Sequence, residues 1–467
     1  MLATKRVFGE RIDRNRRAGV PSRADFARYL MTTNRSTWWM WAGILALALG
    51  VRVGSGIWWQ SRLPAETRFR FGDSESYWDM GKGLAQGKPL QYGKVRNFRI
   101  FRTPGYPFLL AGLFKICGDG RDATHEPSVL CGRLLSALLG TIAVGGVGIL
   151  GYLLFGARTA AVAGVVVSLY PEAIALSTFV LSEAPFCPLM VLHLVAWTLA
   201  WQAPDAKQRT TWSIAAGVAA GLATLMRPSW LLFLPFAVPL GLVFYRERPK
   251  QLMIAAVMLG GLCVTMLPWW IRNYQIAGRF VPTTLQVGAS LYDGIGPQAT
   301  GTSEMSFVLP FVREQVAADE AATNAGEPLV GIFEDRLDHR MQVASIAWAR
   351  QNPSRVVELA GIKFLRMWSP LPNAAEFQST ALRLALAITY TPVILLALLG
   401  LWKFARRGWP YLLCFLPAVY FTCLHCVFVS SLRYRQPAML VLIILAAGVV
   451  MNFVPAFREK PLRKSTS

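Results

Sequence analysis

Charged residues are scarce in this chain, and their scarcity excludes an ordinary soluble protein. Only 16% of the 467 residues are charged and 54% are hydrophobic, whereas a soluble domain carries about 25% charged residues. The apolar residues gather in runs of roughly 18–25, long enough to cross the ~30 Å hydrocarbon core as helices. Open sheets are excluded there, because unpaired backbone groups are costly in lipid. The composition therefore predicts an all-α polytopic membrane protein.

Histidine is also rare, and four residues in the whole chain make a histidine-based metal centre an unfavoured interpretation. His193 and His425 lie in apolar runs and are interpreted as core residues. The seven cysteines lie in or beside apolar runs and show no disulfide framework. Cys423 and Cys426 form a CxxC pair without the second pair that a zinc site needs. We interpret them as small packing residues.

A cleavable signal peptide and an internal repeat are absent as well. The first apolar run starts near Trp38 and is too long for the apolar region of a signal peptide. The residues before it are strongly basic and are interpreted as a cytoplasmic leader. Many transporters are built from inverted repeats, so the lack of one favours another class of membrane protein.

Basic residues, by contrast, are abundant: 48 Lys and Arg against 26 Asp and Glu give a formal charge of +22. Most of them flank apolar runs, which the positive-inside rule explains better than nucleic-acid binding does. With the N-terminus inside, the basic turns at Arg158, 207–209, 246–250 and 403–407 all fall on the cytoplasmic side. We expect a multi-pass protein of the cytoplasmic (inner) membrane, with no nucleic-acid partner.

About ten transmembrane helices are expected from the apolar runs. A proline disfavours helix in the residue before it, so Arg227-Pro228 is taken to separate two short helices. The expected spans are 38–59, 128–155, 158–176, 179–200, 212–226, 229–245, 251–271, 380–402, 409–429 and 436–453. The stretch 104–117 is amphipathic and is expected at the membrane interface.

The runs and the polar stretches between them divide the chain into five regions. These are a basic leader (1–37), a transmembrane region (38–275) with a first outward loop at 60–127, an outward segment (276–378), the C-terminal spans (379–453) and a cytoplasmic tail (454–467).

The first outward loop holds the clearest candidate for acid–base chemistry. Its sequence FGDSESYWD (71–79) places Tyr77 one helical turn after Asp73. A carboxylate beside a cavity at the outer face can act as general base toward an acceptor hydroxyl. The alternative is an exposed acidic helix start, which the helix dipole favours.

The same loop then becomes basic and ends in Arg102 and the motif TPGYP, which contains Tyr106. Basic residues on the outer side run against the usual charge bias. Arginine pairs with phosphate through two parallel hydrogen bonds, so an anionic, phosphate-linked substrate is one explanation. Contact with lipid headgroups is the other.

Further candidates lie at the expected outward ends of the spans. Glu183 has apolar flanks on both sides, and a carboxylate in such a position usually faces a cavity or a partner. Glu172 is the weaker candidate. The alternative is that these glutamates lie at frayed helix ends and form only local hydrogen bonds. Arginines recur at the same level, where simple snorkelling to the interface is the alternative. They are Arg227, Arg272, Arg433 and Arg435.

These motifs, in this order, resemble the lipid-linked-sugar glycosyltransferases of the GT-C fold, glycosyltransferase family 39 in particular. The resemblance rests on Asp73 four residues before Tyr77, TPGYP at 103–107, Ser182-Glu183, GLATLMRP at 221–228, PWWIRNY at 268–274 and RYRQP at 433–437. It touches most of the chain from about 40 to 440.

The resemblance implies a GT-C-like membrane fold and an inverting sugar transfer from a polyprenyl-phosphate donor to a hydroxyl on a protein, lipid or glycan. Asp73 matches the family's catalytic acid and Glu183 the region of a second cavity acid. Tyr77, Arg102, Tyr106, Arg227, Arg272, Arg433 and Arg435 are expected to bind substrate. No cofactor is assigned, and a divalent cation between Asp73 and Glu183 stays open.

The chain departs from the family in one respect that concerns the site. Some members carry two adjacent acids in the first loop, whereas here Ser74 separates Asp73 from Glu75, so a role for Glu75 is not implied. Two other functions stay open: a flippase for lipid-linked sugars, and a polysaccharide polymerase or ligase. A polymerase or ligase would not require Asp73 in the first loop.

Overall fold

The computed structural model describes residues 35–453, apart from 65–68, 70, 94–97, 118–127, 305, 307 and 373–378. The predicted leader (1–37) and the tail (454–467) therefore lie largely or wholly outside the described residues. Regular structure in the described part is helical, with one isolated antiparallel bridge between Tyr92 and Phe98. The all-α prediction is confirmed.

Seven helices of the described part are long and apolar enough to cross a membrane. They are α3 (Arg35–Arg62), α6 (Val129–Phe155), α9 (Glu183–Gln202), α12 (Arg248–Ala277), α17 with its 3-10 extension (Thr380–Arg407), α18 with α19 (Trp409–Val427) and α20 (Leu432–Phe453). Shorter apolar helices are α5 (Gly105–Ile116), α7 (Ala157–Leu169) and η2 with α11 (Pro228–Phe244). The count of ten crossings stays a prediction.

Two of the expected spans differ from the structure near Glu172 and Glu183. The run 158–176 is divided, because α7 ends at Leu169 and a short helix, α8 (Pro171–Leu176), begins at a proline. The run 179–200 starts as a helix only at Glu183. Hydropathy is continuous across these runs, so it does not reveal that Glu172 and Glu183 lie in the first turns of two different helices. Only Pro171 signalled the break between α7 and α8.

The bundle is built around two helices that are buried on all sides. In α9 and α20, 83% and 78% of the most apolar window is buried, against 22% in α3 and α17. A helix that is apolar all round occupies the core, so α9 and α20 form the centre and α3 and α17 face outward. Glycines let the neighbouring helices approach: α10 (Ala206–Met226) touches the α12 backbone at Gly217.

The basic turns gather at one pole of the bundle. Gln202, at the end of α9, donates a hydrogen bond to the Leu153 carbonyl. Tyr411 of α18 donates to the Leu154 carbonyl at 2.7 Å, and Tyr245 donates to the Gly408 carbonyl at 3.2 Å. These contacts join the ends of α6, α9, α11 and α17 at one level.

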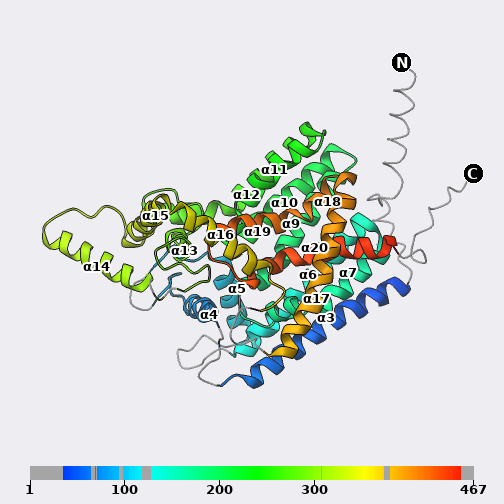
Figure 1. Ribbon diagram of the computed structural model, residues 1–467, viewed down its shortest axis with the longest axis horizontal. Helices are drawn as coiled ribbons and strands as arrows, with labels where there is room; N and C mark the ends of the chain where they lie inside the picture. Colours follow the sequence, from blue (N-terminus) through cyan, green and yellow to red (C-terminus); the bar gives the residue numbers. More distant parts are fainter. Residues whose placement is uncertain are drawn as a thin grey trace, which may run out of the picture.

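The opposite pole carries α4 (Gly72–Ala85), α5 and the long polar segment. Figure 1 shows the helices of that segment gathered at one end of the molecule, with α14 farthest from the bundle. The segment contains α13 (Val287–Gly294), α14 (Val308–Asn324), α15 (Phe333–Gln351) and α16 (Pro353–Trp368).

The polar segment is fastened to the first loop by a buried carboxylate. Glu334 of α15 accepts hydrogen bonds from the backbone N–H groups of Arg99 and Ile100, at 2.8 and 3.0 Å. Ile100 in turn accepts one from Leu285, at 3.1 Å. Burial raises the pKa of Glu334, the hydrogen bonds and Arg272 oppose this, and the net pKa is about 7. The local sequence gave no indication of this attachment.

Candidate active site

The site begins with Asp73 in the first turn of α4. Phe71 is extended and starts the helix, and the carboxylate lies near the positive end of the helix dipole. Trp78 and Tyr77 are buried on the inner face of this helix, whereas Glu75 and Asp79 are exposed. The Asp73 side chain is 32% exposed. Only one of the three acids of the FGDSESYWD segment therefore faces the interior, and Glu75 takes no part in the site.

Two arginines from distant parts of the chain pair with Asp73. Arg102 Nη2 donates to Oδ1 at 2.7 Å, and Arg433 Nη2 donates to Oδ2 at 2.9 Å. Burial by itself raises the pKa of Asp73, but the charges and hydrogen bonds of the two arginines outweigh it and hold the pKa well below its usual range. The carboxylate is therefore ionised and engaged on both oxygens.

Arg433 also joins Asp73 to the second carboxylate. Its Nε lies 2.9 Å from Glu183 Oε1, and the same oxygen pairs with Arg227 Nη1. The Glu183 side chain is only 1% exposed, whereas Arg227 and Arg433 are 15% and 18% exposed. We call these five residues, Asp73, Arg102, Glu183, Arg227 and Arg433, the carboxylate–arginine cluster. With every member ionised, its charges sum to +1, from three cations and two anions.

Helix ends explain why these residues meet. Glu183 is the first residue of α9, Arg227 follows the last residue of α10, and Arg433 lies in the first turn of α20. The Thr103 hydroxyl donates to the Met226 carbonyl at 3.3 Å. A Cβ on Gly105 would lie 2.7 Å from the Leu225 carbonyl oxygen, so the TPGYP turn needs glycine to lie against the end of α10.

The two predicted tyrosines lie beneath the cluster. Tyr77 and Tyr106 are both buried, with ring centroids 5.3 Å apart in an edge-to-face arrangement. The Arg102 guanidinium lies 5.3 Å from the Tyr77 ring centroid. A cation over an aromatic face is stabilised and held in place, so Tyr77 supports Arg102 and Tyr106 supports Tyr77.

Tyr434 is a site residue that the sequence analysis missed. Its ring lies 5.5 Å from the Arg227 guanidinium and 5.1 Å from that of Arg433. His425 stacks on the Tyr434 ring, with centroids 4.2 Å apart. The RYRQP motif had drawn attention to its arginines, and nothing in its pattern singled out the tyrosine between them.

The structure does not bring Arg272 or Arg435 into the cluster. Arg272 donates to the carbonyls of Arg99 and Leu90, at 3.0 and 3.1 Å, and so braces the first loop. Arg435 is fully buried and pairs with Glu172 at 2.5 Å. Both are held by protein groups, so of the four arginines singled out at span ends, Arg227 and Arg433 are the two that contact Asp73 or Glu183.

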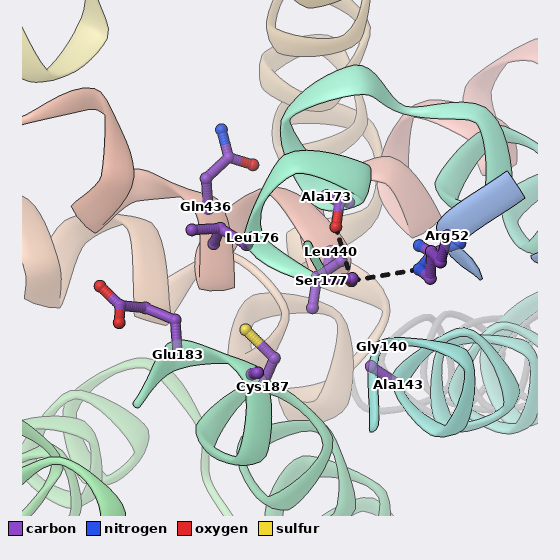
Figure 2. Close-up of a pocket in the computed structure, with 11 residues that line it drawn as sticks. Arg52, Gly140, Ala143, Ala173, Leu176, Ser177, Glu183, Cys187, Gln436 and Leu440 are labelled. Atoms are coloured by element: carbon purple, nitrogen blue, oxygen red, sulfur yellow. Dashed lines mark hydrogen bonds between the residues drawn. The ribbon is translucent and has the colours of Figure 1, made fainter. Parts of the chain in front are cut away.

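A narrow pocket runs inward from Glu183, with Cys187, Ser177 and Arg52 along its lining (Figure 2). Its cavity volume is about 20 Å³, enough for one water and too small for a sugar. Arg52 donates to the Ser177 hydroxyl and to the carbonyls of Val167 and Ser168, at 3.1–3.2 Å. An arginine in the middle of the first apolar run was a sequence signal for this polar interior, and the sequence analysis passed over it.

The fit to a divalent cation between Asp73 and Glu183 is poor. Arg433 lies between the two carboxylates and contacts both. Within the described ranges, no three His, Cys, Asp or Glu side chains come together. A cation there would have to displace an arginine, and no step of the chemistry is assigned to one.

Part of the chain matches a known family model. Residues 102–271 match the family model described as dolichyl-phosphate-mannose-protein mannosyltransferase. This match contains Arg102, Glu183 and Arg227 but not Asp73 or Arg433. A search of curated proteins found no significant match.

Several solved structures are similar to the chain. The apo oligosaccharyltransferase of Archaeoglobus fulgidus has a TM-score of 0.54 at 15% identity, over 90% of this chain and 51% of that one. The same archaeal enzyme, AglB, in complex with an inhibitory peptide and a dolichol-phosphate gives 0.51 at 14%, over 89% and 50%. ArnT from Cupriavidus metallidurans in the apo state gives 0.41 at 19%, over 89% and 77%.

The predicted GT-C fold is confirmed by the first two of these likenesses. The chain spans about half the length of the oligosaccharyltransferase. At this level of identity the likeness concerns the fold of a multi-pass membrane protein.

Proposed function

We propose that the protein is an inverting membrane glycosyltransferase that moves a sugar from a polyprenyl-phosphate donor to an acceptor hydroxyl. The observation that supports this most directly is the carboxylate–arginine cluster, in which Asp73 lies within 2.9 Å of two arginines at one pole of a GT-C bundle. The family model over residues 102–271 is named for a transferase with a lipid-phosphate sugar donor, and the archaeal enzyme of the same fold has been solved with dolichol-phosphate.

The charge of the cluster fits such a donor. A sugar linked to a lipid through one phosphate is a phosphodiester with one negative charge, and the cluster carries one uncompensated positive charge. Arg102, Arg227 and Arg433 converge from three elements, and arginine binds phosphate through paired N–H groups. The donor phosphate and the whole carboxylate–arginine cluster together are neutral, so charge balance requires no metal ion.

Asp73 is the proposed general base. It takes the proton of the acceptor hydroxyl as the hydroxyl oxygen attacks the anomeric carbon. The bond from that carbon to the phosphate oxygen breaks, and its electron pair stays on the leaving polyprenyl phosphate. Arginines that face the phosphate stabilise the charge that grows there. Attack opposite the leaving group inverts the anomeric centre.

The same contacts imply that donor binding changes the base. Arg102 and Arg433 now occupy both oxygens of Asp73, which makes the carboxylate a weak base. A donor phosphate competes for these arginines and thereby frees an oxygen and raises the affinity of Asp73 for a proton. Glu183 keeps Arg227 and Arg433 near the phosphate throughout.

The proposed location is the cytoplasmic membrane with the site on its outer face. The basic turns of α7, α10, α11 and α17 lie at the pole opposite the cluster, where the positive-inside rule places the cytoplasm. The donor then enters from the outer leaflet, and a protein, lipid or glycan hydroxyl arrives from the aqueous side.

The test is sugar transfer in membranes with a panel of labelled polyprenyl-phosphate sugars, comparing the wild type with Asp73→Asn. We expect transfer from one donor class and its loss, by at least about 10²-fold for removal of a general base, in a variant that inserts normally. Glu75→Gln is the matched control, an exposed acid of the same helix, and should retain activity. Transfer that survives Asp73→Asn would remove the base assignment, and absence of transfer with every donor would favour the flippase or polymerase alternatives.

A further inference from the structure

A second buried ion pair lies next to the cluster and involves the same helix start. Arg435 Nη2 pairs with Glu172 Oε1 at 2.5 Å, and Gln436 Nε2 donates to Glu172 Oε2. The Tyr170 hydroxyl donates to the same Oε2 at 3.1 Å. The side chains of Arg435 and Glu172 are 0% and 10% exposed. We call Tyr170, Glu172, Arg435 and Gln436 the inner clamp.

Arg435 ties a third element to this clamp. Its Nη1 donates to the carbonyls of Met367 and Ser369, at 3.0 and 2.6 Å, at the end of α16. Its guanidinium lies 3.8 Å from the Tyr390 ring centroid in α17. These partners are all protein groups and the Arg435 side chain is 0% exposed, so burial keeps this residue away from a donor.

The two ion pairs connect the same two chain segments. Glu172 lies in α8 and Glu183 is the first residue of α9, and Arg433 and Arg435 lie in the first turn of α20. At about 100° per residue, positions two apart on a helix point some 200° away from each other. Arg433 therefore faces the site while Arg435 faces the inner clamp, and the direction of one fixes the direction of the other.

We propose that Glu172 is a positioning residue for the transfer reaction: by holding Arg435 and Gln436 it sets the rotation of the α20 start and so the place of the Arg433 guanidinium between Asp73 and Glu183. This inference rests on the proposed function, since its effect is read in sugar transfer. Glu172 itself contacts neither Asp73 nor Glu183 through any hydrogen bond or ion pair found among the described residues.

The kinetic expectation differs from that of a donor-binding residue. In Glu172→Gln, Arg433 is displaced while Arg102 and Arg227 remain to bind the phosphate. Loss of alignment acts mainly in the transition state, where a shift of about 1 Å can cost on the order of 10²-fold in rate. We expect kcat to fall 10- to 100-fold, in the order of magnitude that misplacement produces, with the KM for the donor nearly unchanged.

The experiment compares Glu172→Gln with Glu172→Asp and with Asp319→Asn. Asp319 is a matched control, because it is similarly buried at 9% and pairs with Arg336 and Arg340 far from the cluster. Glu172→Asp keeps the charge and should restore part of kcat, and Asp319→Asn should leave kcat unchanged. Amide hydrogen exchange of residues 431–436 is the second readout and should accelerate in Glu172→Gln only.

The outcomes separate this inference from the proposed function. If the wild type transfers no sugar, the proposed function fails, whereas unchanged exchange at 431–436 in Glu172→Gln contradicts the positioning role regardless of activity. A wild-type kcat in Glu172→Gln, or an equal loss in Asp319→Asn, overturns it as well. Should Glu172→Gln fail to fold, Gln436→Met, which removes one clamp contact without leaving a buried charge unpaired, serves for the same two measurements.

Discussion

The pairing of Glu183 with Arg227 gives the sharpest energetic prediction. Glu183 is 1% exposed and shares one oxygen between Arg227 and Arg433. Removing one partner of a buried ion pair typically costs about 3–5 kcal/mol, because the remaining charge is left uncompensated, whereas replacing both is close to neutral. Since both arginines are partly exposed and Arg433 keeps Asp73, the lower value of about 3 kcal/mol applies to each single substitution.

A double-mutant cycle tests this directly. Glu183→Gln and Arg227→Met are each expected to destabilise by about 3 kcal/mol. The double variant leaves no uncompensated charge at Arg227 but still deprives Arg433 of Glu183, so it is expected to destabilise by about 3–4 kcal/mol rather than 6, a coupling of roughly 2–3 kcal/mol. The assay is reversible unfolding in detergent with increasing denaturant. Glu247→Gln with Lys250→Met is a control, because that pair lies at the surface with 60% and 22% of the side chains exposed, and surface pairs contribute about 0–1 kcal/mol. Additivity within about 0.5 kcal/mol at Glu183 and Arg227 would refute the reasoning.

Two further predictions concern pH. Arg102 holds the pKa of Asp73 below its usual range, so the stability that this pair contributes is complete above about pH 4 and is lost only as pH falls through the lowered pKa. Arg102→Gln should raise the pKa of Asp73 and move the acid limb of the kcat/KM profile to higher pH. An acid limb that does not move would contradict the assignment of Asp73 as the base. For Glu334 the sign is opposite: the folded state retains a proton between 4.5 and about 7, so stability should fall as pH rises through that interval, by at most about 3 kcal/mol. Melting temperatures at pH 5 and pH 8 should differ less in Glu334→Gln than in the wild type, and equal differences would show that another group is responsible.

Local composition determined the class of this protein. Low charge, long apolar runs and basic turns are properties of short windows, and they are enough to predict helices, their approximate ends and the presence of acids and arginines at those ends. The order of the motifs was enough for the GT-C resemblance. A bend such as the one at Tyr170 was less visible, because hydropathy continues across it and only Pro171 marks the new helix.

Tertiary structure decided which charges meet. Arg433 and Arg435 are the same residue type and flank the same tyrosine, yet one joins Asp73 and Glu183 and the other is buried against Glu172. The difference arises because the two side chains point to different faces of α20 and different elements pack against each face. A short stretch of sequence does not specify which elements those are. Arg272, equally prominent in the sequence, braces a loop instead, because the long-range packing of α12 places it beside backbone carbonyls rather than beside an acid.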